Sequence, residues 1–268
     1  MCDRFGVSPS GFYAWEKRDN DPQNDKDKAL LKHIRRIHRG RRRCYGSPRV
    51  YRLLRRLGVV CSRRRVARVM RDNGIKATVV GLYRYYPNRH EHYQRIENHL
   101  GNASAPTGID QQWAADFTYM KTKQDRWVYL ATVMDLYSRR VIGWSLSTVR
   151  NVDFTQSSLS MAVKKRKPVA GAIFHTDQGA EYAAENFQSA LASANLTASM
   201  SRKGRCTDNA TAESFFHTFK TESYYQKQFK NKADLENEFK RYIDFYNNER
   251  LHSSLNYMSP VEYENRAA

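Results

Sequence analysis

Residues 113–120, WAADFTYM, set one aspartate inside an apolar run, and this stretch decides how the second half of the chain is expected to fold. Its alternating pattern is typical of a β-strand with Trp113, Ala115 and Phe117 on one face and Asp116 on the other. An unpaired carboxylate on a buried strand is unfavourable. Asp116 is therefore expected to meet a metal ion or a cationic group, or to accept hydrogen bonds at a strand end.

A second aspartate, Asp177, follows the apolar run of residues 172–174, in the stretch FHTDQGAEY. It stands at the expected carboxyl end of a strand, where α/β sheets build their sites, and Gly179 lets the backbone turn away. Taken alone, Asp177 could simply cap the following turn. Two carboxylates held close together cannot both stay ionised without a cation between them, so the pair favours a metal site.

A third carboxylate, Glu213, stands on a helix predicted over residues 208–225, on a polar stripe opposite the phenylalanines of that helix. A solvated helix face would give the same pattern, so Glu213 alone indicates no chemistry. The interpretation depends on the trio Asp116, Asp177 and Glu213. The polar stripe also contains Asn209, His217 and Lys220.

The pattern of residues 109–268 is that of an α/β domain. Three β-rich runs predict an antiparallel meander, and strands and helices alternate after it. The strands are expected at 112–120, 127–134, 141–146, 172–174 and 196–199, and the helices at 151–164, 184–194 and 208–225, with a last amphipathic helix around 235–246.

Residues 45–75 predict a helix-turn-helix whose second helix begins after Ser62 and ends at Gly74. A polar stretch with a proline, residues 19–27, favours a linker before a helix over residues 28–38. The arginines of the second helix suit contact with phosphate and entry into a DNA groove, although a solvated basic face has the same composition. The candidate DNA contacts there are Arg63, Arg64, Arg65 and Arg68.

The 268-residue chain is strongly basic, with 46 Lys and Arg against 27 Asp and Glu, a net charge of +19. Most of the excess falls in residues 1–100, and it favours a polyanionic partner, nucleic acid first. No run approaches the roughly 18 apolar residues of a membrane span, and no secretory segment follows Met1. We expect a cytoplasmic, nucleoid-associated protein with no membrane partner.

A zinc site is a weaker alternative. His33 and His38 precede Cys44 and Cys61, but zinc ligands usually come as a close C-x2-4-C pair, and the two cysteines are far apart. Two helical histidines and two buried thiols are the favoured interpretation.

Five stretches are similar, in order, to the second-reading-frame transposases of the IS-three family of bacterial insertion sequences, and the order of the acid trio resembles the DDE signature of retroviral integrases. The likeness covers about residues 45–264. The stretches are WAADFTYM (113–120), YLATVMDLYSRRVIGW (129–144), FHTDQGAEY (174–182), SRKGRCTDNATAESFFHTFKTE (201–222) and YNNERLHSSLNYMSPVEYE (246–264).

The resemblance implies a ribonuclease H-like integrase core, a mixed sheet with flanking helices, preceded by an all-α helix-turn-helix region. It implies cleavage and transfer of DNA strands. Asp116 would bridge two Mg²⁺ ions, with Asp177 on one and Glu213 on the other, and Mn²⁺ would substitute. The expected divisions are an N-terminal helical segment (1–44), the helix-turn-helix (45–76), a linker (77–108) and the catalytic domain (109–268).

The resemblance also assigns DNA contacts. Lys220 would touch the transposon end near the cleaved phosphate, and Asn209 would orient Glu213 or bind DNA. A basic loop before the catalytic helix is expected to become ordered on DNA through Arg202, Lys203 and Arg205. The expected partners are the terminal inverted repeats, target DNA, further copies of the chain on DNA, and an upstream-frame product or fusion.

Two other functions stay open. A DNA-binding regulator, or the relic of a transposase, would have the same basic N-terminal half without catalysis. A general ribonuclease H-like nuclease would explain the metal site but not the basic extension of about 100 residues.

Overall fold

The computed structural model describes residues 6–13, 22–78, 96–202 and 206–267, and divides the chain into two compact units, residues 1–79 and 80–268. Most of the predicted linker lies outside the described residues, and the four predicted divisions of the chain remain a prediction.

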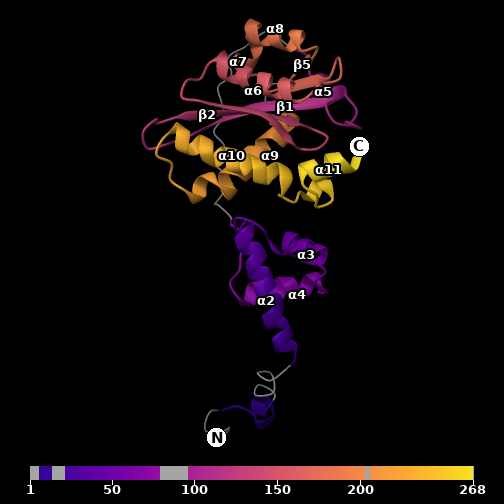
Figure 1. Cartoon of the computed structure of the whole chain (residues 1–268), viewed down its shortest axis with the longest axis vertical. Coiled ribbons are helices and arrows are strands. Elements are labelled where there is room, and N and C mark those ends of the chain that lie inside the picture. The colour runs from indigo at the N-terminus through magenta and orange to yellow at the C-terminus, as the bar shows by residue number, and fades with distance from the viewer. Residues whose placement is uncertain (1–5, 14–21, 79–95, 203–205, 268) are drawn as a thin grey trace. The chain divides into compact units, whose positions relative to one another are not determined.

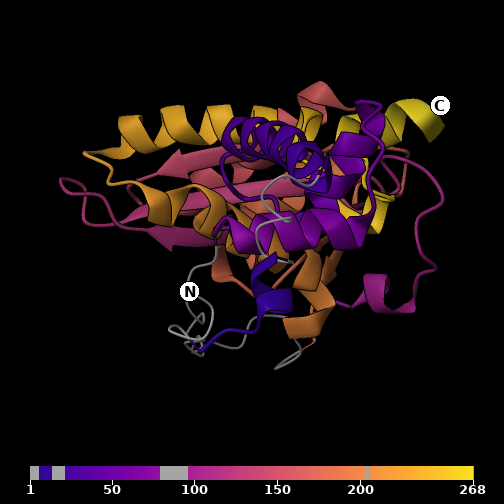
Figure 2. The same ribbon diagram turned by 90° about the horizontal axis from the view of Figure 1, so that it is seen from below.

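Three helices form the core of the first unit (Figures 1 and 2). They are α2(Pro22–Gly40), α3(Ser47–Arg56) and α4(Arg63–Asp72). The helix-turn-helix is confirmed in α3 and α4. Ser62 caps α4, since its Oγ accepts a 3.2 Å hydrogen bond from the Arg65 N–H. The buried apolar side chains that join the helices are Leu30, Ile34, Ile37, Val50, Leu54, Val66, Val69 and Met70.

The second unit contains, among its described residues, a mixed five-stranded sheet in the order β3-β2-β1-β4-β5. The first three strands form the predicted antiparallel meander, and β4 and β5 run parallel to β1. The strands are β1(Gln112–Met120), β2(Val128–Asp135), β3(Val141–Ser147), β4(Ile173–Thr176) and β5(Thr197–Met200). The predicted α/β fold class is confirmed.

Helices cover both faces of this sheet (Figure 1). One layer contains α6(Val152–Lys165), α7(Ala180–Ala183) and α8(Glu185–Ser193), and the opposite layer contains α9(Ala210–Glu222) and α10(Lys232–Asn248). The remaining helices are short: α5(His99–Asn102), η2(Cys206–Asn209), η3(Tyr224–Gln226), η4(Ser253–Leu255) and α11(Pro260–Ala267). No helix in the described ranges is long and apolar enough to cross a membrane.

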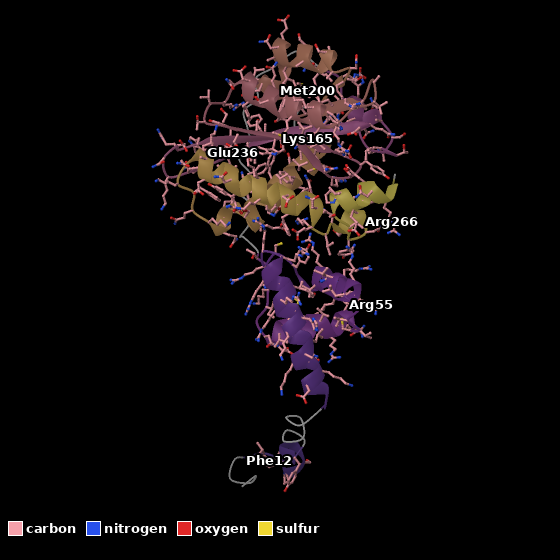
Figure 3. The ribbon with its side chains drawn as sticks, viewed as in Figure 1. Phe12, Arg55, Lys165, Met200, Glu236 and Arg266 are labelled. Atoms are coloured by element: carbon pink, nitrogen blue, oxygen red, sulfur yellow. The ribbon has the colours of Figure 1, made fainter. Side chains whose placement is uncertain are left out.

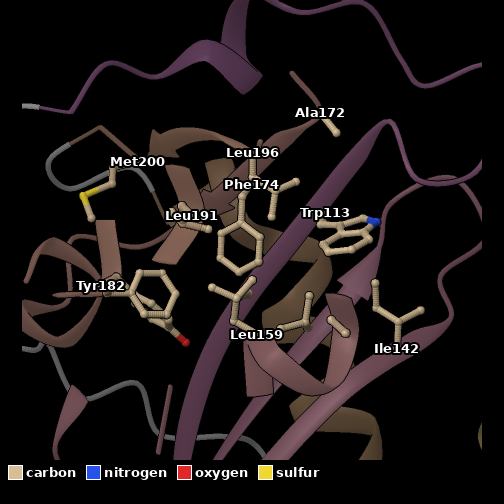
Figure 4. Close-up of a cluster of buried hydrophobic side chains, with 13 residues drawn as sticks. Trp113, Ile142, Leu159, Ala172, Phe174, Tyr182, Leu191, Leu196 and Met200 are labelled. Atoms are coloured by element: carbon tan, nitrogen blue, oxygen red, sulfur yellow. The ribbon is translucent and has the colours of Figure 1, made fainter. Parts of the chain in front are cut away.

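The α6 and α8 side of the sheet carries an apolar core (Figure 4). Trp113 and Ala115 belong to it and Phe117 packs against it, as the alternation along β1 predicts. Gly143 lets β3 approach α6 closely, because a Cβ atom there would stand 2.2 Å from the Ser158 carbonyl oxygen. Asp116 therefore faces the other side, toward α9 and α10.

Aromatic rings fill the space between α9 and α10. Phe215 meets Tyr246, and Phe219 meets Phe239, in edge-to-face contacts with ring centroids 4.9 Å apart. These contacts fix α9 against α10 and leave the start of α9 beside β1.

Candidate active site

β1 and β4 bring two of the predicted carboxylates to the same level. Ala114 of β1 is paired with His175 of β4 in a parallel ladder. Because the strands run in the same direction, Asp116 and Asp177, each two residues further on, stand side by side at the carboxyl end of β4.

The third carboxylate comes from the first turn of α9. Asn209, which caps this helix, donates a 3.1 Å hydrogen bond from Nδ2 to the Ala115 carbonyl oxygen, next to Asp116. Glu213 follows one turn later. The structure therefore brings Asp116, Asp177 and Glu213 to one region of the second unit.

The three carboxylates act on one another electrostatically. Burial raises the pKa of Asp116 well above its usual value, and the charges of Asp177 and Glu213 raise it further. Burial, followed by the charge of Asp177, also raises the pKa of Glu213. Backbone amides oppose part of this repulsion, since Asp116 Oδ1 accepts from Phe117 N–H at 2.8 Å and Asp177 Oδ1 accepts from Gly179 N–H at 3.0 Å.

The donor set fits a hard divalent cation, because three carboxylates supply the oxygen ligands that Mg²⁺ prefers. Among the described residues, the Lys220 charge lowers the pKa of Asp116, but by less than the charge of either other carboxylate raises it, and a bound cation would relieve the remaining repulsion. Glu213 is exposed and the two aspartates are half-buried. Across the described ranges, no group of three His, Cys, Asp or Glu side chains is arranged to hold a metal ion.

The hydrogen bonds of His38 and Cys44 do not support a zinc site. His38 bonds through Nε2 to the Lys76 carbonyl oxygen at 3.0 Å, and Cys44 Sγ donates to the Arg41 carbonyl oxygen at 3.0 Å.

Lys220 is buried rather than solvated, with 8% of its surface exposed. Its Nζ donates to Thr118 Oγ1 at 2.7 Å and lies 5.7 Å from the centroid of the Tyr119 ring. Burial lowers its pKa to about 8, against the opposing effect of the Asp116 charge. The ammonium group thus stands on the Asp116 side of β1, and its contact with DNA stays a prediction.

Asn209 is also buried, and its Oδ1 has no hydrogen-bond partner in the described part of the chain. Its bond to the Ala115 carbonyl favours the alternative in which Asn209 positions the catalytic helix, and hence Glu213. A direct contact between Asn209 and DNA stays a prediction.

The basic loop is described only in part, since Lys203 and Arg205 lie outside the described residues. Arg202 pairs with Asp208 through two hydrogen bonds of 3.0 Å. These bonds hold the pKa of Asp208 down at about 2. Arg202 is therefore paired with Asp208 of the same unit, although most of the Arg202 side chain is exposed.

The four arginines predicted on α4 fall into two pairs. Arg65 and Arg68 both bind Asp27 of α2, with N–O distances of 2.7 and 2.5 Å. Arg63 and Arg64 are exposed and form no ion pair with any residue that the structure describes. Figure 3 shows another basic side chain of this unit, Arg55, pointing away from the helices.

Three residues near the acid trio were not predicted. Arg150 forms two hydrogen bonds with Glu181, and Tyr182 is fully buried with no hydrogen-bond partner for its hydroxyl within the described ranges (Figure 4). Burial, followed by the charges of Asp116 and Asp177, raises the Tyr182 pKa well above its usual value. Glu181 and Tyr182 stand in the quoted stretch FHTDQGAEY, whereas no local pattern links Arg150 to Glu181.

Models of known protein families match nearly the whole of this architecture. An integrase core domain matches residues 106–206, a second integrase core domain matches residues 194–260, and an HTH-like domain matches residues 25–81. The first match contains Asp116 and Asp177, and the second contains Glu213.

Curated relatives extend over almost the full length. The chain is 34% identical, over 270 residues, to transposase InsF of insertion sequence IS3A from Escherichia coli (strain K12), which covers 99% of this chain and 93% of the relative. The chain belongs to the IS3 family of insertion-sequence transposases. This IS3-family transposase is also 33% identical to the insertion element IS600 uncharacterized 31 kDa protein of Shigella sonnei, over 99% of this chain and 98% of the relative.

A chain of a solved viral complex shares the fold of the transposase. A chain in the simian T-cell lymphotropic virus intasome in complex with the PP2A regulatory subunit B56 gamma matches 66% of this chain and 61% of its own length, with a TM-score of 0.53 and 18% identity. The HTLV-2 integrase catalytic core domain in complex with magnesium matches 59% of this chain and 97% of its own length, with a TM-score of 0.44 and 15% identity. The predicted family and integrase-core fold are confirmed.

Proposed function

We propose that this transposase binds the terminal inverted repeats of its insertion sequence and catalyses metal-dependent DNA cleavage and strand transfer at Asp116, Asp177 and Glu213. The observation that carries this proposal is the convergence of the three carboxylates from β1, the turn after β4, and α9.

The three acids would hold Mg²⁺, and Mn²⁺ would substitute because it accepts the same oxygen donors. A bound pair of ions would supply activation of the attacking oxygen and stabilisation of the leaving oxygen. The charges of both other carboxylates act on Asp116 and raise its pKa. Asp116, Asp177 and Glu213 would together hold these ions, as the resemblance to integrase-like transposases implies.

The reaction needs no nucleophilic side chain. In cleavage, water attacks a phosphorus atom of the transposon end, and the bond to the 3′ oxygen breaks to leave a 3′-OH. In transfer, that 3′-OH attacks a phosphorus atom of the target, and a target 3′ oxygen leaves. The Lys220 ammonium, on the Asp116 side of β1, would pair with a phosphate next to the cleaved bond.

DNA recognition would begin in the first unit. Arg63 and Arg64 are exposed on the second helix of the helix-turn-helix and form no described ion pair, so they suit phosphate contact. Arg202 and the loop residues Lys203 and Arg205 would add contacts near the catalytic helix. Several copies of the chain would hold two transposon ends together, with an upstream-frame product or fusion as a further partner.

The decisive experiment is a joining assay. A labelled duplex copied from the terminus of the insertion sequence is incubated with supercoiled plasmid and Mg²⁺, with the wild type and with Asp116→Asn. Metal-dependent joining that Asp116→Asn abolishes supports the proposal. Cutting without joining would indicate a general nuclease, and binding alone a regulator or relic. Adding the upstream product tests whether the chain needs it.

A further inference from the structure

Arg150 is held rigidly beside the proposed catalytic carboxylates. Its guanidinium donates from Nε to Glu181 Oε1 and from Nη2 to Glu181 Oε2, the second bond measuring 3.1 Å. The guanidinium also lies over the Phe117 ring, 5.0 Å from its centroid. Glu181 is buried, whereas 48% of the Arg150 side chain is exposed. The buried carboxylate thus presents a fixed cation to solvent.

Glu181 and Asp177 are neighbours across Gly179. A Cβ atom at Gly179 would stand 3.0 Å from Asp177 Oδ1 and 3.5 Å from Glu181 Oε2. The Asp177 charge also contributes to raising the pKa of Arg150, after the larger effect of the Glu181 hydrogen bonds. Arg150 therefore lies within electrostatic reach of Asp177.

Arg150 and Lys220 stand on opposite faces of β1. Lys220 bonds to Thr118, and Arg150 covers Phe117, the residue before it. Side chains of consecutive residues in a strand point to opposite faces of the sheet. The carboxylates are thus flanked by one cation on the α9 side and another on the α6 side.

The free donors of Arg150 fit a phosphate. A guanidinium has five N–H donors, and Glu181 accepts from only two of its nitrogen atoms, which leaves the Nη1 donors and one on Nη2. The planar donor set matches phosphate oxygens, and the bond to Glu181 already fixes its orientation.

We propose that Arg150, oriented by Glu181, binds a backbone phosphate of the DNA that receives the transposon end. This inference rests on the proposed function, because strand transfer must bring two DNA backbones to one carboxylate cluster. With the cleaved end on the Lys220 side, the target approaches from the α6 side, where Arg150 is the exposed cation next to Asp177.

The test compares two steps catalysed by the full chain with Mg²⁺. End cleavage is measured on the terminal duplex alone, and joining is measured against increasing plasmid concentration with an end that already carries its 3′-OH. Arg150→Ala should raise the plasmid concentration for half-maximal joining about ten-fold, as expected for one charged hydrogen bond. The ratio of joining to cleavage should fall to a similar degree.

Further variants separate a phosphate contact from a folding effect. Arg150→Ala with Glu181→Gln avoids leaving a buried charge unpaired and should show the same loss, and Arg150→Lys should recover part of it. Lys230→Ala removes an exposed positive charge just before α10 and should match the wild type. The slope of log affinity for plasmid against log salt should fall by about 0.9 in Arg150→Ala, because one phosphate contact is lost.

Two results would overturn the inference. The first is an unchanged plasmid concentration for half-maximal joining, both in Arg150→Ala and in Arg150→Ala with Glu181→Gln. The second is an equal loss of cleavage and joining in Arg150→Ala, with an unchanged slope of log affinity against log salt. If the wild type itself neither cleaves nor joins, the proposed function fails instead.

Discussion

Lys220 Nζ donates a 2.7 Å hydrogen bond to Thr118 Oγ1, so a buried ammonium is fixed on the strand that carries Asp116. A lysine in this position is easier to deprotonate than one in water, because burial penalises its charged form. The charge available for a phosphate at this place therefore depends on pH in the physiological range.

We predict that the affinity for terminal DNA falls as the pH rises through about 8. The pKa of Lys220 is lowered to about 8, so the folded protein loses this charge well below the usual value of 10.5. Losing one charged contact should weaken binding by about ten-fold between pH 7 and 9.5. Fluorescence anisotropy with a labelled terminal duplex, in buffer without divalent metal, measures the effect.

Lys220→Arg is the control for this pH effect, since arginine keeps its charge throughout the range. It should flatten the pH profile. An equal decline in the wild type and Lys220→Arg would show that another group is responsible.

A second prediction concerns metal and stability. The folded pKa of Asp116 is raised, so its favourable contribution is present below the unfolded pKa and is lost as the pH rises. At pH 7 without metal, Asp116 therefore destabilises the fold, and Asp116→Asn should be more stable by about 1 kcal/mol.

With Mg²⁺ the wild type should become more stable than Asp116→Asn, because a ligand that binds only the folded state stabilises it. In thermal unfolding, millimolar Mg²⁺ should raise the Tm of the wild type and have less effect on Asp116→Asn. Equal shifts in both proteins would mean that Asp116 does not hold the ion.

The sheet and the acid trio follow from patterns that extend over only a few residues. Alternation along β1 predicts which face Asp116 takes, and Gln112–Met120 forms the strand that the sequence predicts. Gly179, two residues after Asp177, marks the turn that follows β4. Such features depend on neighbouring residues, so they are readable in one sequence.

Burial along a helix is harder to predict. The helical wheel puts Glu213 and Lys220 on one polar stripe, yet the first is exposed and the second is buried. Periodicity gives the direction of a side chain around the helix axis. It does not show that the Glu213 side chain meets solvent while the Lys220 side chain lies over β1.

Contacts between distant residues leave no local pattern. Helix α2 begins at Pro22, inside the stretch expected to be a linker, and its Asp27 is paired with Arg65 and Arg68. Helix α11 was not predicted. Its Glu264 accepts a 2.8 Å hydrogen bond from Ser138 and pairs with Arg140 and Arg166.

A third prediction separates the two roles considered for Asn209. If Asn209 positions α9, Asn209→Ala should slow cleavage by at least ten-fold while terminal-DNA affinity changes little. Losing the bond to the Ala115 carbonyl should also lower the free energy of unfolding by about 1 kcal/mol. Single-turnover cleavage at saturating DNA, anisotropy and denaturant unfolding measure the three effects.

Asn248→Ala, which removes an exposed amide on α10, is the matched control and should leave all three unchanged. Loss of DNA affinity with normal cleavage at saturation would instead support Asn209 as a DNA contact.

The last prediction divides the arginines of α4 by their partners. Arg63→Ala should weaken binding to duplex DNA several-fold and reduce the salt slope by about 0.9, because Arg63 is exposed and unpaired among the described residues. Arg65→Ala should mainly destabilise the first unit, since it removes a 2.7 Å bond to half-buried Asp27. Amide hydrogen exchange in α2 and α4 should become faster, because the free energy of opening these helices falls by about 1 kcal/mol. Asp27→Asn should show the same faster exchange without weaker DNA binding, and a loss of affinity as large in Arg65→Ala as in Arg63→Ala would contradict this division.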